Sequence, residues 1–277
     1  ISGKDISSDG ITTERLSITL KGKIFTLVTH TIDSVPVWLY DVVSPDTPLS
    51  ISHFNALART VIEDIATRGK VPILVGGTGY YLSSLFRTIE YLDIPQDNIF
   101  RALLLGKPTD VLQKKLAGVD PIRWKGMNIS DRNNPRRLVR ALEVVRWKKT
   151  HKDKHIDRLP FEPLWIGLRV GDGKLPRRIR DRVKARLVSG ALEEAKKAEY
   201  LPDHLPSAST IGLSILLRLL RGEISRNQAI ELWTQEEIRY AKRQMTWFTR
   251  QPDIRWYDIG EGSVEHQVEK DVGEWYT

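Results

Sequence analysis

The sequence predicts an α/β fold built on a parallel sheet, with a small helical insertion. Strand and helix patterns alternate between residues 37 and 82, an order typical of βαβ units. Between residues 91 and 133 the strand patterns stop, and short helical patterns separated by turn residues replace them. We therefore expect a discontinuous core, residues 1–90 and 134–277, interrupted by a helical insertion at 91–133.

The first part of the core is predicted from strand patterns that surround one long helix. Residues 16–20 and 24–28 have the alternating or apolar pattern of a β-hairpin. Residues 37–43 are a third strand candidate. Residues 52–68 carry apolar side chains at helical spacing, and Gly69 marks the end of that helix.

The most informative stretch is 71–82, which reads as a buried strand, a glycine turn and a helix. The apolar run 73–75 fits a parallel strand covered on both faces. Gly76 and Gly77 lack a Cβ, so their backbone can approach a ligand closely. Thr78 stands where the helix begins, and the free N–H groups there suit an anion such as phosphate. The same residues would equally form an ordinary βα turn with a threonine cap.

The insertion and the rest of the core follow from helical periodicity and capping signals. In the insertion we expect helices at 100–105 and 111–116, and loops at 120–121 and 127–134. The later elements are a helix from Pro135, a strand at 164–170, a basic helix at 174–188, helices at 192–200 and 213–220, a long helix opened by the capping box Ser225-Arg-Asn-Gln228, a strand at 254–258 and a final helix.

Composition narrows the classes of function. The chain has no cysteine, which excludes disulfides and cysteine–metal sites and fits a reducing cytosol. No apolar run reaches the ~18–20 residues of a membrane helix, and the first residues do not resemble a signal peptide. Lys and Arg number 43 against 35 Asp and Glu. This excess favours a polyanionic partner, nucleic acid first.

Arginine is concentrated in three clusters, at 136–140, 178–186 and 239–250. Each could be a solvated helix face, but Arg can also hold two phosphate oxygens at once. The six histidines lack metal-ligand spacing, and neither a serine nucleophile elbow nor a Walker motif occurs. From the pattern alone, the chain is an α/β protein with an anion site at a βα turn and a basic surface.

Five blocks, in the same order along the chain, resemble the bacterial tRNA dimethylallyltransferase family. Their combination is specific, and the similarity runs from about residue 35 to residue 258. The blocks are Pro72-Ile-Leu-Val-Gly-Gly-Thr-Gly-Tyr-Tyr81, Asn134-Pro-Arg-Arg-Leu-Val-Arg-Ala-Leu-Glu143, the Arg178 to Arg182 helix with Ser189-Gly190-Ala-Leu-Glu-Glu194, Ile211-Gly212 with Gly222-Glu-Ile-Ser225, and Tyr240-Ala-Lys-Arg-Gln-Met-Thr-Trp-Phe248.

The resemblance implies a P-loop NTPase-like core with a tRNA-binding helical insertion. It implies transfer of a dimethylallyl group from dimethylallyl diphosphate to the exocyclic amine of the adenosine 3′ of the anticodon, with Mg²⁺ as cofactor. The target base would be flipped out of its stack to reach the diphosphate substrate. We expect tRNA and dimethylallyl diphosphate as partners, no membrane, a cytoplasmic location and a monomer.

The resemblance also assigns roles to residues. Thr78 and Arg182 are the candidate catalytic residues. Gly76 and Gly77 join Arg182 in holding the diphosphate, whose growing negative charge must be stabilised. No residue is assigned as a metal ligand. The tRNA-binding candidates are Thr78, Arg101, Arg136, Arg137, Leu138, Val139, Arg140, Ser209, Thr210, Ile211, Gly212, Leu213, Ser214 and Arg243.

The chain departs from the family pattern in three places. Ile1-Ser-Gly-Lys-Asp5 resembles the segment just after the family's general-base aspartate, so we expect that aspartate and the P-loop upstream of Ile1 and this chain alone to be inactive. Leu213 and Ser214 stand where an aromatic and a basic residue are usual, and Asn134 replaces an aspartate. The alternatives are a non-catalytic tRNA- or RNA-binding module on the same fold, and a prenyltransferase of free adenine nucleotides.

Overall fold

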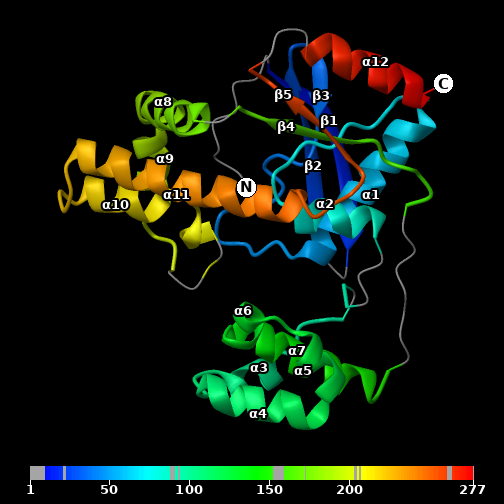
Figure 1. Cartoon of the computed structure of the whole chain (residues 1–277), viewed down its shortest axis with the longest axis vertical. Helices are drawn as coiled ribbons and strands as arrows, with labels where there is room; N and C mark the ends of the chain where they lie inside the picture. Colours follow the sequence, from blue (N-terminus) through cyan, green and yellow to red (C-terminus); the bar gives the residue numbers. More distant parts are fainter. Residues whose placement is uncertain are drawn as a thin grey trace. The chain divides into compact units, whose positions relative to one another are not determined.

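The computed structural model describes residues 10–20, 23–87, 91–92, 94–151, 159–171, 173–202, 205, 207–260 and 264–276. The chain forms two compact units (Figure 1). We call Ile1–Phe86 with Leu159–Thr277 the core unit, and Arg87–Arg158 the helical unit. The helical unit is larger than the predicted insertion at 91–133.

A three-stranded antiparallel sheet opens the core unit. Strands β1 (Gly10–Leu20) and β2 (Lys23–Ile32) form the predicted hairpin, whose turn residues lie outside the described part of the chain. Strand β3 (Val35–Val37) pairs with the end of β2. The prediction of a strand over 37–43 was wrong. Leu39 and Asp41 have φ of 68° and 51°, values in the left-handed region that an extended strand excludes.

Helix α1 (Ile51–Thr67) packs against this sheet and confirms the predicted long helix. It begins where the Ser50 side chain accepts a hydrogen bond from the His53 backbone N–H at 3.2 Å, an N-cap typical of serine. The apolar face of α1 then meets β2. The buried side chains in this layer are Phe25, Leu27, Val43, Leu57 and Val61.

The predicted buried strand at 73–75 is not a strand. Residues 71–76 are in no β-ladder, and the side chains of Ile73 and Val75 are 82% and 93% exposed. A parallel strand needs a hydrogen-bonded neighbour. Within the described ranges, parallel pairing joins only β4 (Trp165–Arg169) and β5 (Ile254–Asp258). The core is therefore mixed α/β with a small parallel sheet, in place of the larger one expected.

Helices make up the rest of the core unit (Figure 1). Apart from the 3₁₀ turn, each was predicted, and the capping box at Ser225 is present with both of its hydrogen bonds. The elements are α2 (Gly79–Phe86), α8 (Lys174–Val188), α9 (Ala191–Lys197), the 3₁₀ turn η1 (Ser207–Ser209), α10 (Leu213–Leu220), α11 (Arg226–Phe248) and α12 (Val264–Tyr276). Helices α8 to α11 share an apolar core that includes Ile179, Val183, Ile230 and Trp233.

The helical unit contains α3 (Asn98–Leu104), α4 (Thr109–Val119), α5 (Pro121–Gly126), α6 (Ile129–Arg132) and α7 (Pro135–Lys148). Helix α6 lies where a loop was predicted, and α5 covers residues that, apart from Pro121, had no predicted element. Asp120 and Asn128 cap them by accepting backbone N–H bonds at 2.9 Å, and these short caps were overlooked in the sequence. Leu138, Ala141 and Leu142 of α7 pack into the core of this unit. Helix α7 therefore belongs here and not to the core unit, which corrects the predicted boundaries.

Candidate functional site

The glycine corner, residues Gly77 to Gly79, is packed against α11. Gln244 Nε2 donates a hydrogen bond to the Gly77 carbonyl at 3.0 Å. Thr78 Oγ1 and the Tyr240 hydroxyl lie 3.4 Å apart. A Cβ on Gly77 would overlap the Gln244 amide, and one on Gly79 would overlap the Trp247 ring. The missing Cβ atoms at 77 and 79 thus make room for α11, a use that the sequence did not reveal.

Thr78 lies at the start of α2, as expected. Its carbonyl accepts the backbone N–H of Tyr81 at 3.0 Å and that of Leu82 at 3.3 Å, so it forms the first turn of the helix. The Thr78 side chain is exposed, and so is Gly76. The hydroxyl at this helix start can therefore meet a ligand from solvent.

Arg182 and Arg186, one turn apart on α8, share a single carboxylate on α11. Arg182 Nη2 lies 2.9 Å from Glu237 Oε2, and Arg186 Nη1 lies 2.9 Å from Oε1. The Glu237 side chain is 9% exposed, whereas the two arginine side chains are 52% and 49% exposed. A buried carboxylate thus fixes two guanidinium groups that remain open to solvent.

Helix α11 connects the glycine corner with Arg182. Glu237, Tyr240 and Gln244 are spaced three and four residues apart, which places them on one face of the helix. Three residues of α-helix rise about 4.5 Å. The residue that holds Arg182 and the residue that touches Thr78 are therefore neighbours along α11. Sequence reasoning missed Glu237 and this packing role, because the three-four spacing shows only that these residues share a face of α11 and not what they contact.

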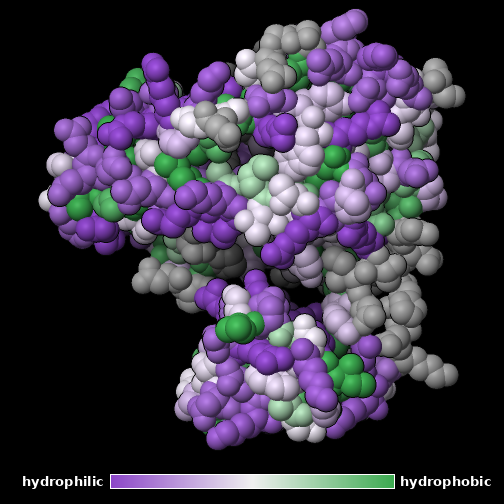
Figure 2. Space-filling view, viewed as in Figure 1, coloured by the Kyte–Doolittle hydropathy of each residue, from purple (hydrophilic) through white to green (hydrophobic). Residues whose placement is uncertain are grey.

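The second half of α11 is basic and lines a shallow hollow of about 300 Å³. Arg243, a predicted tRNA contact, lies in it with its guanidinium 5.6 Å from the Tyr240 ring centre. Hydrophilic residues dominate the visible surface of the α8–α11 group (Figure 2). The lining residues are Lys242, Arg243, Thr246, Trp247 and Arg250.

The predicted tRNA segment 209–214 forms the turn into α10. Gly212 has a φ of 87°, and a Cβ there would meet the Trp233 ring at 2.5 Å. Its backbone N–H donates to Glu236 Oε2 at 3.3 Å. Thr210 and Ser214 are exposed, while Ile211 and Leu213 are half-buried against the core. The Ser209 side chain lies outside the described part of the structure.

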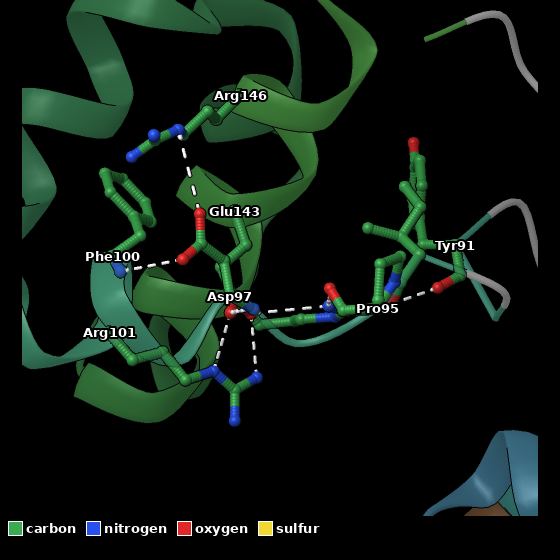
Figure 3. A network of polar contacts seen from close by, with 9 residues as sticks. Tyr91, Pro95, Asp97, Phe100, Arg101, Glu143 and Arg146 are labelled. Atoms are coloured by element: carbon green, nitrogen blue, oxygen red, sulfur yellow. Dashed lines mark hydrogen bonds and ion pairs between the residues drawn. The ribbon is translucent and has the colours of Figure 1, made fainter. Parts of the chain in front are cut away.

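In the helical unit, two predicted tRNA contacts, Arg101 and Arg140, bind the buried carboxylate of Glu143. Figure 3 labels Arg101 and Glu143 within this network. Arg101 donates to both oxygens of Glu143 at 2.7 Å. Arg140 donates to the carbonyls of Tyr91 and Ile94 at 2.9 and 2.7 Å, and to Glu143 at 3.3 Å. Arg101 and Arg140 therefore hold the helical unit together, and only the family resemblance connects them with tRNA.

The Glu143 side chain is 1% exposed. Burial alone would raise the pKa of its carboxyl. Hydrogen bonds from Arg101, from the Asp97 backbone N–H and from Arg140 outweigh burial and bring the pKa below its ordinary value. The carboxyl is therefore ionised at neutral pH and is a structural anchor.

The remaining candidates on α7 divide by face. Arg136 and Arg137 are exposed, and Arg137 forms an ion pair with Asp131. Val139 is half-buried. Leu138 is fully buried in the core of the helical unit, so its side chain packs inside the unit, and the tRNA contact at this position stays a prediction. Helical periodicity, which turns Leu138 inward, explains this burial.

The described residues lack the features of a metal centre and of a membrane-spanning helix. They contain no group of three or more His, Asp or Glu side chains that could hold a metal ion. None of their helices has the length and apolar content to span a bilayer.

Comparison with known proteins gives consistent matches. The IPP transferase family model matches residues 27–251. A tRNA dimethylallyltransferase of Anoxybacillus flavithermus is 33% identical over 242 residues, 84% of this chain and 75% of the relative. The one from Carboxydothermus hydrogenoformans is 32% identical over 256 residues, 87% of this chain and 80% of the relative.

Solved structures agree with these matches. The tRNA isopentenylpyrophosphate transferase of Bacillus halodurans aligns with a TM-score of 0.51 and 29% identity, covering 82% of this chain and 71% of that protein. A eukaryotic dimethylallyltransferase acting on tRNA aligns with a TM-score of 0.65 and 25% identity, covering 82% of this chain and 62% of that protein.

Proposed function

We propose, because this chain belongs to the IPP transferase family, that it serves the transfer of a dimethylallyl group from dimethylallyl diphosphate to tRNA. The acceptor is the exocyclic amine of the adenosine 3′ of the anticodon. The core has the P-loop NTPase-like arrangement of the family, and the chain acts as a monomer in the cytoplasm. The names of the relatives and the eukaryotic structure acting on tRNA support the proposal.

In this reaction a bond forms between the amine nitrogen and the allylic carbon. The bond between that carbon and the diphosphate oxygen breaks, and the amine gives its proton to a general base, the role that the family resemblance assigns to an aspartate. Negative charge therefore grows on the departing diphosphate, and fixed cationic donors stabilise it. Arg182 supplies such donors, because a guanidinium has five N–H groups and its side chain is half exposed.

The single observation that carries this assignment is that α11 contacts both the glycine corner and Arg182. We propose that Gly76, Gly77 and Thr78 receive the diphosphate from one side and Arg182 from the other. Thr78, with its exposed hydroxyl, also touches the tRNA beside the reacting amine.

For tRNA binding we favour the exposed candidates of both units: Thr78, Arg136, Arg137, Thr210, Ser214 and Arg243. Their cations neutralise phosphates, so affinity will fall steeply with salt. Arg101 and Arg140 support the interface by holding the helical unit together.

Mg²⁺ is the cofactor that the family implies, and it commonly binds one or two carboxylates together with substrate phosphates. The described residues do not supply a cluster of three protein ligands. They do not fit a site made by protein alone, so no step above depends on the metal.

Binding is the direct test for the chain as it stands. We expect it to bind a tRNA with adenosine 3′ of the anticodon, and to bind more weakly when that adenosine is changed to guanosine. Fluorescence anisotropy at several salt concentrations measures both. Equal affinity for the two tRNAs would contradict recognition of the acceptor base.

Turnover is tested in a chimera that carries, ahead of Ile1, the residues that precede the matched part of a relative. We expect transfer of labelled dimethylallyl to tRNA and none to AMP in competition. Transfer to AMP would favour an adenine-nucleotide prenyltransferase. Tight tRNA binding without transfer would favour a non-catalytic RNA-binding module.

A further inference from the structure

We propose that Arg182 and Arg186 together form a two-guanidinium clamp for the diphosphate, and that Glu237 is the positioning residue that holds the clamp. This inference rests on the proposed function and deepens it. It adds Arg186 as a second diphosphate ligand and gives the buried carboxylate of α11 a role in binding.

The clamp consists of the buried Glu237 carboxylate and two guanidinium groups that are open to solvent. Each guanidinium is fixed by one hydrogen bond of 2.9 Å to a different oxygen of Glu237. Each side chain is about half exposed, at 52% for Arg182 and 49% for Arg186. A guanidinium has five N–H donors, so both groups retain donors for a ligand.

The net charge of the cluster and the packing of Arg186 also support binding of an anion. One carboxylate against two guanidinium groups leaves one excess positive charge, so the cluster still attracts an anion. Arg186 also lies 6.0 Å from the centre of the Trp233 ring, a distance at which an aromatic face attracts a cation. Arg186 is thus held from two sides, by Glu237 and by Trp233.

Two guanidinium groups held side by side match the two phosphoryl groups of a diphosphate. Planar donors bind phosphate oxygens in pairs, and their fixed spacing adds specificity to charge. The clamp should therefore prefer diphosphate to orthophosphate. A loose pair of the same arginines would have the charge without this preference.

A second ion pair between the same helices provides a matched control. Arg180 Nη1 and Glu231 Oε2 lie 2.8 Å apart, and both side chains are about half exposed. Arg180→Ala and Glu231→Gln thus remove a contact between α8 and α11 and leave the clamp intact.

The experiment is titration calorimetry of the chain with inorganic pyrophosphate and with orthophosphate. We expect Arg182→Ala and Arg186→Ala each to weaken pyrophosphate binding about tenfold, as the loss of a charge-assisted contact would. Glu237→Gln should also weaken pyrophosphate binding and should lower the preference for pyrophosphate over orthophosphate. Both control variants should bind like the unaltered chain.

Whether Glu237→Gln weakens or tightens pyrophosphate binding decides whether Glu237 positions the arginines or only neutralises their charge. If Glu237 only neutralised charge, its removal would tighten the binding of both anions, and that result would overturn the positioning role. An unchanged affinity in Arg186→Ala, with Arg182→Ala weakened, would overturn the clamp and leave the proposed function standing. An unchanged affinity in Arg182→Ala, or no binding by the unaltered chain, would contradict the proposed diphosphate site itself. Circular dichroism checks folding, and the half-exposed Arg186 keeps the test valid if Glu237→Gln fails to fold.

Discussion

The two units of this protein use the same chemical device, a buried glutamate that holds two arginines, for different ends. In the helical unit, Glu143 is 1% exposed and its partners Arg101 and Arg140 are 34% and 29% exposed. In the core unit, Glu237 is 9% exposed and its partners are about half exposed. The two clusters differ in how many arginine N–H donors stay exposed to solvent once the glutamate is bound.

In the helical unit each arginine gives more of its donors to acceptors within the unit. Arg101 gives two hydrogen bonds to one carboxylate, and Arg140 gives others to the carbonyls that precede α3. In the core unit each arginine gives one hydrogen bond to Glu237, and its other N–H groups can serve a ligand. An arginine cluster in a sequence can therefore be structural or ligand-binding, and its acceptors decide which.

Removing the Glu143 carboxylate is expected to have the largest effect. Glu143→Ala leaves two arginines facing a buried gap and should destabilise the helical unit by about 3 kcal/mol, the lower end for a broken buried pair, since the arginines can partly rehydrate. Hydrogen exchange of the α3 and α7 amides measures this change. Asp110→Ala, which removes an exposed ion pair of α4 with Lys114, is the control with little expected change.

Acid should unfold the helical unit through the same group. The folded-state pKa of Glu143 lies below the ordinary value of 4.5. Its stabilising contribution is therefore complete above that ordinary value and is lost as pH falls through the folded-state pKa. The same amides, followed by exchange at decreasing pH below 4.5, should lose protection. In Glu143→Gln this step should be missing, and an identical acid profile would assign the step to another carboxylate.

Glu237→Gln should cost less stability than Glu143→Ala. Its arginine partners are half exposed and water can replace the lost contacts, so we expect a loss of about 1 kcal/mol, the size of one net hydrogen bond. Thermal unfolding followed by circular dichroism measures it. A loss as large as that of Glu143→Ala would make the two glutamates equivalent and would break the comparison.

The smallest effect is expected from an arginine without a structural task. Arg136 is exposed at the start of α7, so Arg136→Ala should leave stability unchanged. It should weaken tRNA binding a few-fold and lower the salt slope of log affinity by about 1. Arg140→Ala should instead lower the stability of the helical unit. Equal effects of both changes on stability would contradict the division between the two arginines.

Local signals in the sequence were sufficient for the longer helices, whereas the short helices α5 and α6 were missed. The capping box at Ser225 and the Asn134-Pro135 start of α7 were predicted and are present. The strand at 73–75 was predicted from its apolar run alone, but a strand also needs a partner to pair with. The segment after Val37 was wrongly predicted as a strand. Its left-handed φ values occur at Leu39, a residue type that rarely adopts them, and at Asp41, where the residue type was a weak signal.

The candidate site was predictable only in part, because sequence spacing shows which residues share a helix face but not which residues on other helices they contact. Spacing showed that Arg182 and Arg186 share a face of α8. Their acceptor, Glu237, lies 55 and 51 residues away on another helix, and a helix pattern does not reveal contacts at that separation. For Leu138 the helix pattern was the better guide. The family resemblance groups it with its arginine neighbours as a tRNA contact, but helical periodicity places it on the buried face of α7.

The fit between the glycine corner and α11 also restricts how this sequence can change over evolutionary time. A side chain gained at position 79 collides with Trp247, and one gained at 77 collides with Gln244. At 79 the obstacle is a large ring, whereas at 77 it is the end of a flexible glutamine side chain that can move aside. A residue smaller than Trp247 is therefore expected to arise before any side chain at 79, whereas position 77 carries no such order of mutations.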